Sequence, residues 1–349
     1  MLLEDIKLTQ YSKGSGCGCK ISPATLKEIL ETSCEDLPVD PRLWVGNESH
    51  DDAAVMQWDG DEGLISTTDF FMPMVDDPYA FGKIAAANAL SDVYAMGGSP
   101  MMALAILGWP IDKLPTAHAR QVMEGARLVC RLAGVPLAGG HSIESAEPIF
   151  GLAVSGRVRR EALKRNNTAQ AGDVLYMTKP LGAGIVSAAV KRGQLDDPTH
   201  LEVMISYMSA LNKIGEAFGR IHGVHAMTDV TGFGLAGHLL EICEGSGLGA
   251  EIQVDDIPVY PFLNTYIARH IYPDMTMKNY SHYASKLSTL SLPQLMLLCD
   301  PQTSGGILVS VAPEAQQEVE ACMKDFGVAA FAHPIGTMTL RGEKVIQVK

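Results

Sequence analysis

The chain contains 349 residues, of which 47% are hydrophobic and 19% are charged. This composition is typical of a globular protein with enough apolar material for a core, and the length predicts about two domains. The formal net charge is −13 at pH 7 and no run of Lys and Arg occurs, which argues against a duplex nucleic-acid binder. An anionic substrate would therefore need metal ions or local cations to offset the acidity.

Hydrophobic periodicity and turn residues predict secondary structure along the whole chain. In chain order, helices are expected over residues 22–31, 78–96 and 116–133, from about 183, over 201–220, from 235, and between 311 and 329. Strands are expected at residues 53–57, 64–68, 101–107, 135–138, 149–158, 174–178, up to 227, and at 307–311, 329–331 and 345–348. Because strands and helices mix without strict alternation, each half should be α/β or α+β, with a domain boundary in the polar segment 166–173.

The cysteines and the apolar stretches indicate in which cellular compartment the protein is expected. Seven scattered cysteines and an N-terminal stretch without the features of a signal peptide predict free thiols and a cytoplasmic protein. Residues 93–111 carry no charge, but Gly97-Gly98-Ser99-Pro100 interrupts them. The remaining apolar run is too short to cross a bilayer, and it predicts a helix end, a turn and a buried strand.

Residues 14–20 read Gly-Ser-Gly-Cys-Gly-Cys-Lys and contain no large apolar side chain. Such a backbone can adopt positive φ and approach a ligand closely. Lys20, three residues after Cys17, should favour the Cys17 thiolate. The pattern predicts a mobile loop with a nucleophilic sulfur and a phosphate-seeking cation, although a flexible linker has the same composition. Cys17 and Cys19 are too close together for the usual zinc spacing, and no second pair follows.

Several aspartates lie beside small residues at predicted strand ends or within the alanine-rich helix 78–96: Asp51, Asp52, Asp69, Asp92 and Asp229. Mg²⁺ prefers hard oxygen ligands, takes one or two carboxylates and fills its other positions with water and phosphate oxygens. Any one of these aspartates could instead cap a turn or a helix. Their similar settings, in a chain with the Cys/Lys loop, favour a metal–phosphate site.

Two glycine-rich segments invite comparison with nucleotide-binding motifs. Gly139-Gly140-His141-Ser142 follows a predicted strand, where backbone N–H groups and a hydroxyl could meet phosphate or ribose. Residues 14–20 are not a Walker A loop, since Cys19 stands where glycine is required. Residues 232–237 do match G-x-G-x-x-G, but Asp229-Val230-Thr231 interrupts the apolar strand that should lead into the first glycine.

Five motifs together resemble those of the selenophosphate synthetase (selenide, water dikinase) family, which is part of the aminoimidazole ribonucleotide synthetase-like ATP-binding superfamily. The likeness extends in order over essentially the whole chain, and the N-terminal loop is its most specific element. The motifs are Gly16-Cys17-Gly18-Cys19-Lys20, Ser66-Thr67-Thr68-Asp69-Phe70-Phe71, Ala138-Gly139-Gly140-His141-Ser142, Met227-Thr228-Asp229-Val230-Thr231-Gly232-Phe233-Gly234 and Asp300-Pro301-Gln302-Thr303-Ser304-Gly305-Gly306.

The resemblance implies that ATP, selenide and water are converted to selenophosphate, AMP and phosphate. It implies a two-domain aminoimidazole ribonucleotide synthetase-like α/β fold and a homodimer in which the N-terminal domains pair their sheets. Residues 1–20 would be a flexible catalytic loop, 21–165 the ATP-binding, metal-binding and dimerisation domain, and 166–349 a C-terminal α/β domain. A selenium-delivery protein and selenophosphate-using enzymes would be further partners, with no nucleic acid or membrane involved.

The resemblance also assigns roles to residues. Cys17 and Lys20 would be catalytic, and Asp52, Asp92 and Asp229 would hold Mg²⁺. The ATP site would be lined by Lys20, Ser49, His50, Asp51, Asp69, Asp92, Gly140, His141 and Ser142.

Three rival functions remain open from the residues alone. A related ATP-dependent enzyme that acts on an amide or carbamoyl-type substrate would have no need for the Cys/Lys loop. A nicotinamide- or flavin-dependent oxidoreductase would use Gly232-Phe233-Gly234 and the residues after it. A non-catalytic selenium- or metal-binding protein would turn over no ATP.

Overall fold

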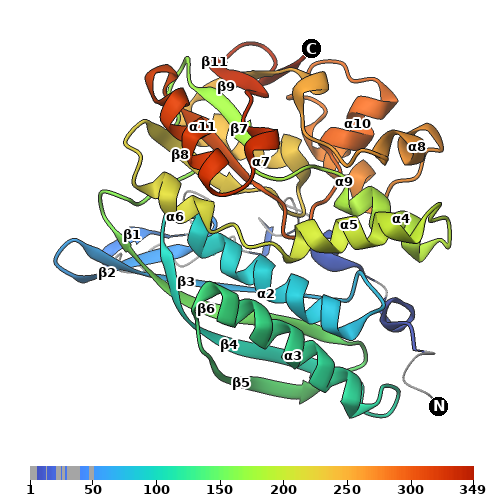
Figure 1. Ribbon diagram of the computed structural model, residues 1–349. Helices are drawn as coiled ribbons and strands as arrows, with labels where there is room; N and C mark the ends of the chain where they lie inside the picture. Colours follow the sequence, from blue (N-terminus) through green and yellow to red (C-terminus); the bar gives the residue numbers. More distant parts are fainter. Residues whose placement is uncertain (1–5, 13, 21–24, 26–27, 30–39, 47–50) are drawn as a thin grey trace.

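The computed structural model describes residues 6–12, 14–20, 25, 28–29, 40–46 and 51–349. Most of the helix expected over 22–31 lies outside these residues, as do Ser49 and His50. Two mixed six-stranded sheets organise the described chain (Figure 1). Two short 3₁₀ turns, η2 (Leu8–Tyr11) and η3 (Gly16–Cys19), precede the first sheet.

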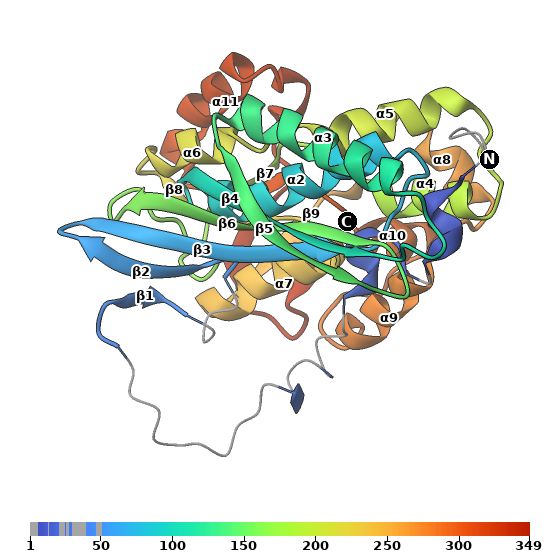
Figure 2. The same cartoon turned by 90° about the horizontal axis from the view of Figure 1, so that it is seen from below.

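The first sheet has the strand order β1-β2-β3-β6-β4-β5. Its strands are β1 (Leu43–Val45), β2 (Ala54–Asp59), β3 (Glu62–Phe71), β4 (Ser99–Trp109), β5 (Leu137–Glu144) and β6 (Ile149–Arg159). Helices α2 (Pro78–Ala95) and α3 (Thr116–Ala133) cover one face of this sheet (Figures 1 and 2). The pairings are antiparallel except for the parallel pair β4–β5.

Helix α2 is buried along nearly its whole length, because the first sheet lies on one side of it and the C-terminal half of the chain on the other (Figure 1). Asp77 caps its first turn by accepting the N–H groups of Tyr79 and Ala80, and Pro78 supplies a preset φ at the first helical position. Glycines let α2 and α3 approach closely. An added Cβ at Gly82 would collide with the Val122 carbonyl oxygen.

The second sheet has the order β12-β9-β11-β7-β10-β8. Its strands are β7 (Val174–Met177), β8 (Val224–Asp229), β9 (Leu248–Ile252), β10 (Ile307–Val311), β11 (Gly336–Leu340) and β12 (Ile346–Val348). The helices of this half are α4 (Ala183–Lys191), α5 (Pro198–Ser209), α6 (Ile214–Gly219), α7 (Gly234–Ser246), α8 (Leu263–Ala268), α9 (Asp274–Tyr283), α10 (Leu292–Leu298) and α11 (Gln316–Asp325). The expected mixed α/β architecture with two units is confirmed.

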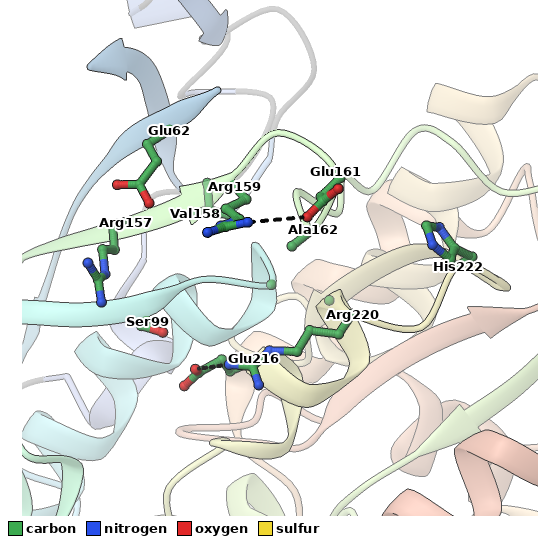
Figure 3. Close-up of a pocket in the computed structure, with 12 residues that line it drawn as sticks. Glu62, Ser99, Arg157, Val158, Arg159, Glu161, Ala162, Glu216, Arg220 and His222 are labelled. Carbon is green, nitrogen blue, oxygen red and sulfur yellow. Dashed lines mark hydrogen bonds and ion pairs between the residues drawn. The ribbon is translucent and has the colours of Figure 1, made fainter. Parts of the chain in front are cut away.

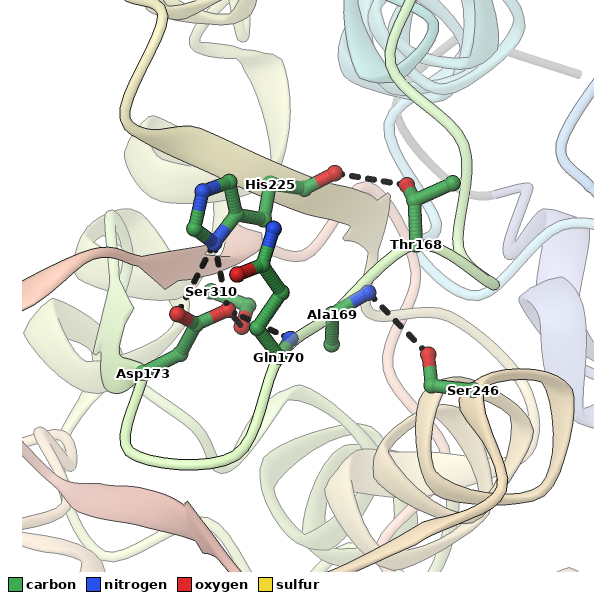
Figure 4. A network of polar contacts seen from close by, with 7 residues as sticks. All are labelled: Thr168, Ala169, Gln170, Asp173, His225, Ser246 and Ser310. Atoms are coloured by element: carbon green, nitrogen blue, oxygen red, sulfur yellow. Dashed lines mark hydrogen bonds and ion pairs between the residues drawn. The ribbon is translucent and has the colours of Figure 1, made fainter.

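Polar contacts attach the connecting segment before β7 to the second sheet (Figure 4). Asp173 is 2% exposed, and its carboxylate accepts hydrogen bonds from the Ser310 hydroxyl (2.7 Å) and the Gln170 N–H (2.8 Å). The ring nitrogen Nδ1 of His225 lies 2.8 Å from the same carboxylate. The Thr168 hydroxyl donates to the His225 carbonyl oxygen at 2.6 Å. The turn-rich segment is therefore held by specific hydrogen bonds.

Four local expectations are wrong. The strand expected to be buried within residues 93–111 is β4, and one of its faces is open, with Met102 and Leu104 each 39% exposed. Residues 201–220 form two helices, α5 and α6, because Ala210 adopts an extended conformation and its carbonyl oxygen accepts a hydrogen bond from Lys179. Residues Ala329–Phe331 form a 3₁₀ turn and not a strand. Gly139-Gly140-His141-Ser142 does not follow a strand but lies inside β5, at the exposed edge of the first sheet. In the described part of the chain, no helix is both long enough and apolar enough to span a bilayer.

Candidate active site

Four aspartates from different elements surround one region between the two halves of the chain. Asp52 precedes β2, Asp69 lies in β3, Asp92 in α2 and Asp229 at the end of β8. Hydrogen bonds hold the group together: the Thr67 hydroxyl reaches both Asp92 and the Asp52 carbonyl oxygen, Thr228 beside Asp229 bonds to Asp52, and Asn88 of α2 bonds to Asp69. We call these four residues the aspartate cluster.

Hydroxyl groups orient two of the carboxylates. The Thr67 hydroxyl donates to Asp92 Oδ2 at 2.5 Å, and the Thr228 hydroxyl donates to Asp52 Oδ1 at 2.9 Å. The other oxygen of Asp52, Oδ2, is buried and has no hydrogen-bond partner among the described residues, and the same holds for Asp229 Oδ2. Buried carboxylate oxygens are normally satisfied, so these two atoms point to a missing cation or donor.

The electrostatics agree with that interpretation. Burial raises the pKa of Asp52 and Asp92 well above the ordinary value, and the charge of Asp229 raises both further. Burial also raises the pKa of Asp229, while Lys20 and other groups lower it. The Lys20 charge favours the ionised form of Asp92 as well. Ionised, the cluster has an excess of negative charge that a divalent cation would compensate.

Within the described residues, no three His, Cys, Asp or Glu side chains are already gathered as a complete metal-binding group. Mg²⁺ does not require such a group, since an ion typically takes one or two carboxylates and completes its shell with water and substrate phosphates. The orphaned oxygens of Asp52 and Asp229 fit such partial ligation.

The loop of residues 14–20 lies against the Asp300–Gly306 segment. The Gly16 N–H donates to the Met72 carbonyl oxygen at 3.0 Å, and Gly16 has φ +52°. A Cβ on Gly16 would lie 2.4 Å from the Thr303 hydroxyl oxygen, so only glycine fits there. The backbone of Cys17 and Cys19 belongs to the η3 turn, which leads directly to Lys20. The loop thus packs against these two segments, and the Lys20 charge lowers the pKa values of Asp92 and Asp229, in the direction expected of the predicted phosphate-seeking cation.

Several polar residues that sequence reasoning missed support this arrangement. Asn88, one helical turn before Asp92, donates through Nδ2 to Asp69 and accepts the Ser304 N–H at 2.7 Å. Ser304 has φ +50°, a conformation that few non-glycine residues adopt. An asparagine within an alanine-rich buried helix was the available sequence signal, because such a group needs a partner.

The buried ammonium of Lys179 and the side-chain amide of Asn212 stabilise the turn that contains Ser304. Lys179 Nζ donates to the carbonyl oxygens of Ala210 (2.8 Å) and Ser304 (2.9 Å), and burial lowers the pKa of Lys179 to about 7. Asn212 Nδ2 donates to the Ser91 hydroxyl (2.8 Å) and the Gly305 carbonyl oxygen (2.7 Å). The two halves of the chain are therefore joined at the aspartate cluster by hydrogen bonds.

Asp51, Gly140 and His141, which were also expected in the ATP site, make other contacts within the chain. The Asp51 carboxylate accepts the Asn166 N–H at 2.7 Å and pairs with Arg165 at 3.5 Å, so it contacts the connecting segment. Gly140 shares a register row with Asp69, but two strands separate β5 from β3, a distance of about 14 Å at the usual strand spacing. His141 is in the row of Phe70, whose side chain faces away from α2 and is 50% exposed.

The G-x-G-x-x-G segment does not form a dinucleotide-binding unit. Among the strands of the described residues, β8 pairs with β10 alone, in antiparallel orientation, and a single parallel bridge joins Ala226 to Arg165. β9, which follows α7, is not a neighbour of β8, so the parallel βαβ arrangement of that fold is missing from the described residues. Gly237 instead packs closely against Phe233 and Tyr283.

A cavity of about 530 Å³ lies between β6 and α6, away from the aspartate cluster (Figure 3). Most of the charged side chains that line this cavity form ion pairs with one another. Arg159 pairs with Glu161 at 3.8 Å, and Arg220 pairs with Glu216 at 2.8 Å. None of the expected site residues lines this cavity.

Comparison with known proteins identifies the family. Residues 50–158 match the model of the AIR synthase related protein, N-terminal domain, and residues 170–349 match that of the C-terminal domain. A selenide, water dikinase of Pseudomonas putida is 54% identical over 345 residues, covering 99% of both chains. One of Shewanella baltica is 55% identical over 331 residues, covering 94% of this chain and 93% of its own. The chain belongs to the selenide, water dikinase family.

Family membership makes the chain a kinase-type enzyme. Its fold is shared with more distant proteins, including AaThiL complexed with AMPPCP and TMP, which superposes with a TM-score of 0.69. That comparison covers 94% of this chain and 93% of the other, at 17% sequence identity, and it therefore bears on the fold alone.

Proposed function

We propose that the protein makes selenophosphate from ATP, selenide and water, and releases AMP and phosphate. The observation that carries the proposal is the aspartate cluster beside Lys20, in a chain whose relatives are named selenide, water dikinase. Phosphoryl transfer depends chiefly on positioning and charge compensation, and this region supplies carboxylates, a cation and buried hydroxyls.

Asp52, Asp92 and Asp229 would hold Mg²⁺, which would neutralise charge on the ATP phosphates. The orphaned oxygens of Asp52 and Asp229 support this role. Thr67 and Thr228 orient the carboxylates, and Lys20 adds a positive charge when residues 14–20 close over the site. Closure would exclude water, which otherwise competes with selenide for the phosphoryl group. Cys17 would bind or protect the selenium atom.

Residues 1–20 would act as the catalytic loop, 21–165 as the ATP-binding, metal-binding and dimerisation domain, and 166–349 as the C-terminal domain. The enzyme would work in the cytoplasm with free thiols. Cys130, Cys243, Cys299 and Cys322 are not in disulfides, which supports a reducing compartment. A selenium-delivery protein and enzymes that use selenophosphate would be its partners.

A homodimer would complete the ATP site. The face of the first sheet opposite α2 and α3 exposes large apolar side chains: Phe70 (50%), Met102 (39%), Leu104 (39%) and Ile143 (59%). Apolar faces of this kind are usually covered by another protein surface. His141 faces this side of the sheet, whereas Asp69, which is hydrogen-bonded to Asn88 of α2, faces the opposite side. Gly140, His141 and Ser142 of a second copy would therefore line the ATP site.

The dimer can be tested at the apolar face. Leu104→Glu and Ile143→Glu should each convert a dimer to a monomer in light scattering, because a buried, unpaired carboxylate opposes association. Selenophosphate formation should fall with the dimer fraction. Leu340→Glu is the matched control, since Leu340 is 78% exposed on the other sheet. A Leu104→Glu protein that stays dimeric would contradict the proposed interface.

The reaction itself can be tested by anaerobic ³¹P NMR of the protein with Mg-ATP, with and without selenide. We expect a phosphorus–selenium signal together with AMP and phosphate, only when selenide is present. Consumption of ATP without a selenium product would agree with the superfamily assignment but would show that selenide is not the substrate. A folded protein without any turnover would favour a binding function.

A further inference from the structure

A cavity of about 660 Å³ lies on the outer side of the catalytic loop. Gly14, Ser15, Gly18 and Lys20 form one of its walls. The opposite walls come from α4 and α9, and Pro301 and Thr303 line it beside the loop. Thr303 lines the cavity, and the next residue, Ser304, donates its N–H to Asn88, which is itself bonded to Asp69, so the cavity adjoins the aspartate cluster.

The lining is strongly positive in an acidic protein. Among the described residues, it contains the cations Lys20, Lys191, Arg192 and Lys278 and one carboxylate, Asp274. The whole chain has a net charge of −13, so this concentration of positive charge is a local exception. Concave sites lined by charge of one sign raise the local concentration of counter-ions and accelerate their association. The cavity should therefore attract anions.

The lining also contains soft, polarisable groups. Met72, Met74 and Met275 contribute thioethers, and Met74 and Met275 are largely buried. Thioethers suit soft partners and offer little to a hard phosphate oxygen. The carboxylates expected to hold Mg²⁺ do not line this cavity. Its chemistry thus differs from that of the ATP phosphates and their metal.

We propose that this cavity admits and holds the selenium substrate as the hydroselenide anion, next to the loop that carries Cys17. The inference rests on the proposed function and adds to it a separate entrance for the second substrate. Hydroselenide is a soft monoanion at neutral pH, which matches a positive lining interleaved with thioethers. Lys191, Arg192 and Lys278 attract the anion, and Lys20 connects the cavity to the aspartates.

The test removes the three outer cations together, as Lys191→Gln, Arg192→Gln and Lys278→Gln in the full chain. All three side chains are exposed, so the fold should persist. At low ionic strength we expect the KM for sodium selenide to rise about tenfold, with the KM for ATP within about twofold of wild type. Added salt should raise the wild-type KM for selenide and so reduce the difference in this KM between wild type and the triple variant. The reason is that salt screens the attraction between the cations and the selenide anion.

A matched triple variant removes three cations outside the cavity: Arg131→Gln, Lys324→Gln and Lys344→Gln. It has the same net charge as the test variant and should keep the wild-type KM for both substrates. An unchanged KM for selenide in the test variant would overturn the proposal, and so would an equal rise in the matched control. If the triple variant does not fold, the single variants Lys191→Gln and Lys278→Gln should each raise the KM by a smaller factor.

Product inhibition distinguishes hydroselenide from phosphate. Inorganic phosphate should inhibit wild type and the test variant equally. Loss of phosphate inhibition with an unchanged KM for selenide would assign the cavity to the phosphate product and overturn the proposal. A wild-type protein that forms no selenium product would instead refute the proposed function, and the cavity assignment with it.

Discussion

Lys20→Ala and Cys17→Ser should each abolish selenophosphate formation, a loss of at least about 100-fold, without unfolding the protein. Lys20 carries a positive charge whose field reaches Asp92 and Asp229. Charge that stabilises a transferring phosphoryl group is worth most where water is excluded, and closure of the loop, as proposed, would create that condition. The backbone of Cys17 lies in the η3 turn (Gly16–Cys19), which directly precedes Lys20.

The measurement is selenide-dependent AMP and selenophosphate production, with thermal unfolding as the test of folding. Cys19→Ser should have a milder effect, and an equal loss would mean that the two thiols act together. Lys7→Ala is the control for an exposed lysine near the same end of the chain. A normal product yield from Lys20→Ala or Cys17→Ser would remove the loop from the catalytic mechanism.

Asp229→Asn should lower turnover by at least about 100-fold and should also raise the melting temperature measured without Mg²⁺. The Asp229 carboxylate is buried, one of its oxygens has no partner among the described residues, and its charge opposes ionisation of Asp52 and Asp92. A neutral amide removes that repulsion, so the metal-free protein should be more stable. The melting temperature should rise by about 2–4 °C for each kcal/mol of electrostatic repulsion that the substitution removes.

Mg-ATP should stabilise wild type, because a ligand that binds only the folded state shifts the unfolding equilibrium. The same addition should stabilise Asp229→Asn much less. Asp112→Asn changes an exposed aspartate outside the cluster and should behave like wild type in both measurements. A variant at Asp229 that retains Mg-ATP stabilisation and turnover would exclude this residue as a metal ligand.

Local sequence patterns were sufficient to predict many elements. The alanine-rich run after Asp77-Pro78 predicted the buried helix α2, and glycine-rich residues ended it. Alternating and continuous apolar runs predicted β3, β6 and β10 because strand formation follows side-chain periodicity. Asp52, Asp69, Asp92 and Asp229 could be selected because carboxylates beside small residues at element ends indicate a ligand site.

Contacts between residues far apart in the sequence determined structural features that local patterns did not predict. The single helix expected over residues 201–220 is interrupted where Ala210 and Asn212 bond to Lys179, Ser91 and Gly305, and no local pattern reports such partners. The edge position of β5 was equally hidden, because periodicity does not say which strands become neighbours. Only the tertiary structure separates His141 from Asp69.

The residue types and their local patterns were enough to select the residues proposed to bind metal, carry positive charge or offer a thiol, and to predict the type and approximate place of most helices and strands. Only the tertiary structure decided which of them meet. Asp229 reaches Asp52 from the other sheet, with Thr228 bonded directly to Asp52. Lys191, Arg192 and Lys278 join Lys20 around one cavity. The physical reason is that side-chain chemistry and local propensity belong to neighbouring residues, whereas burial and charge repulsion depend on packing between distant segments.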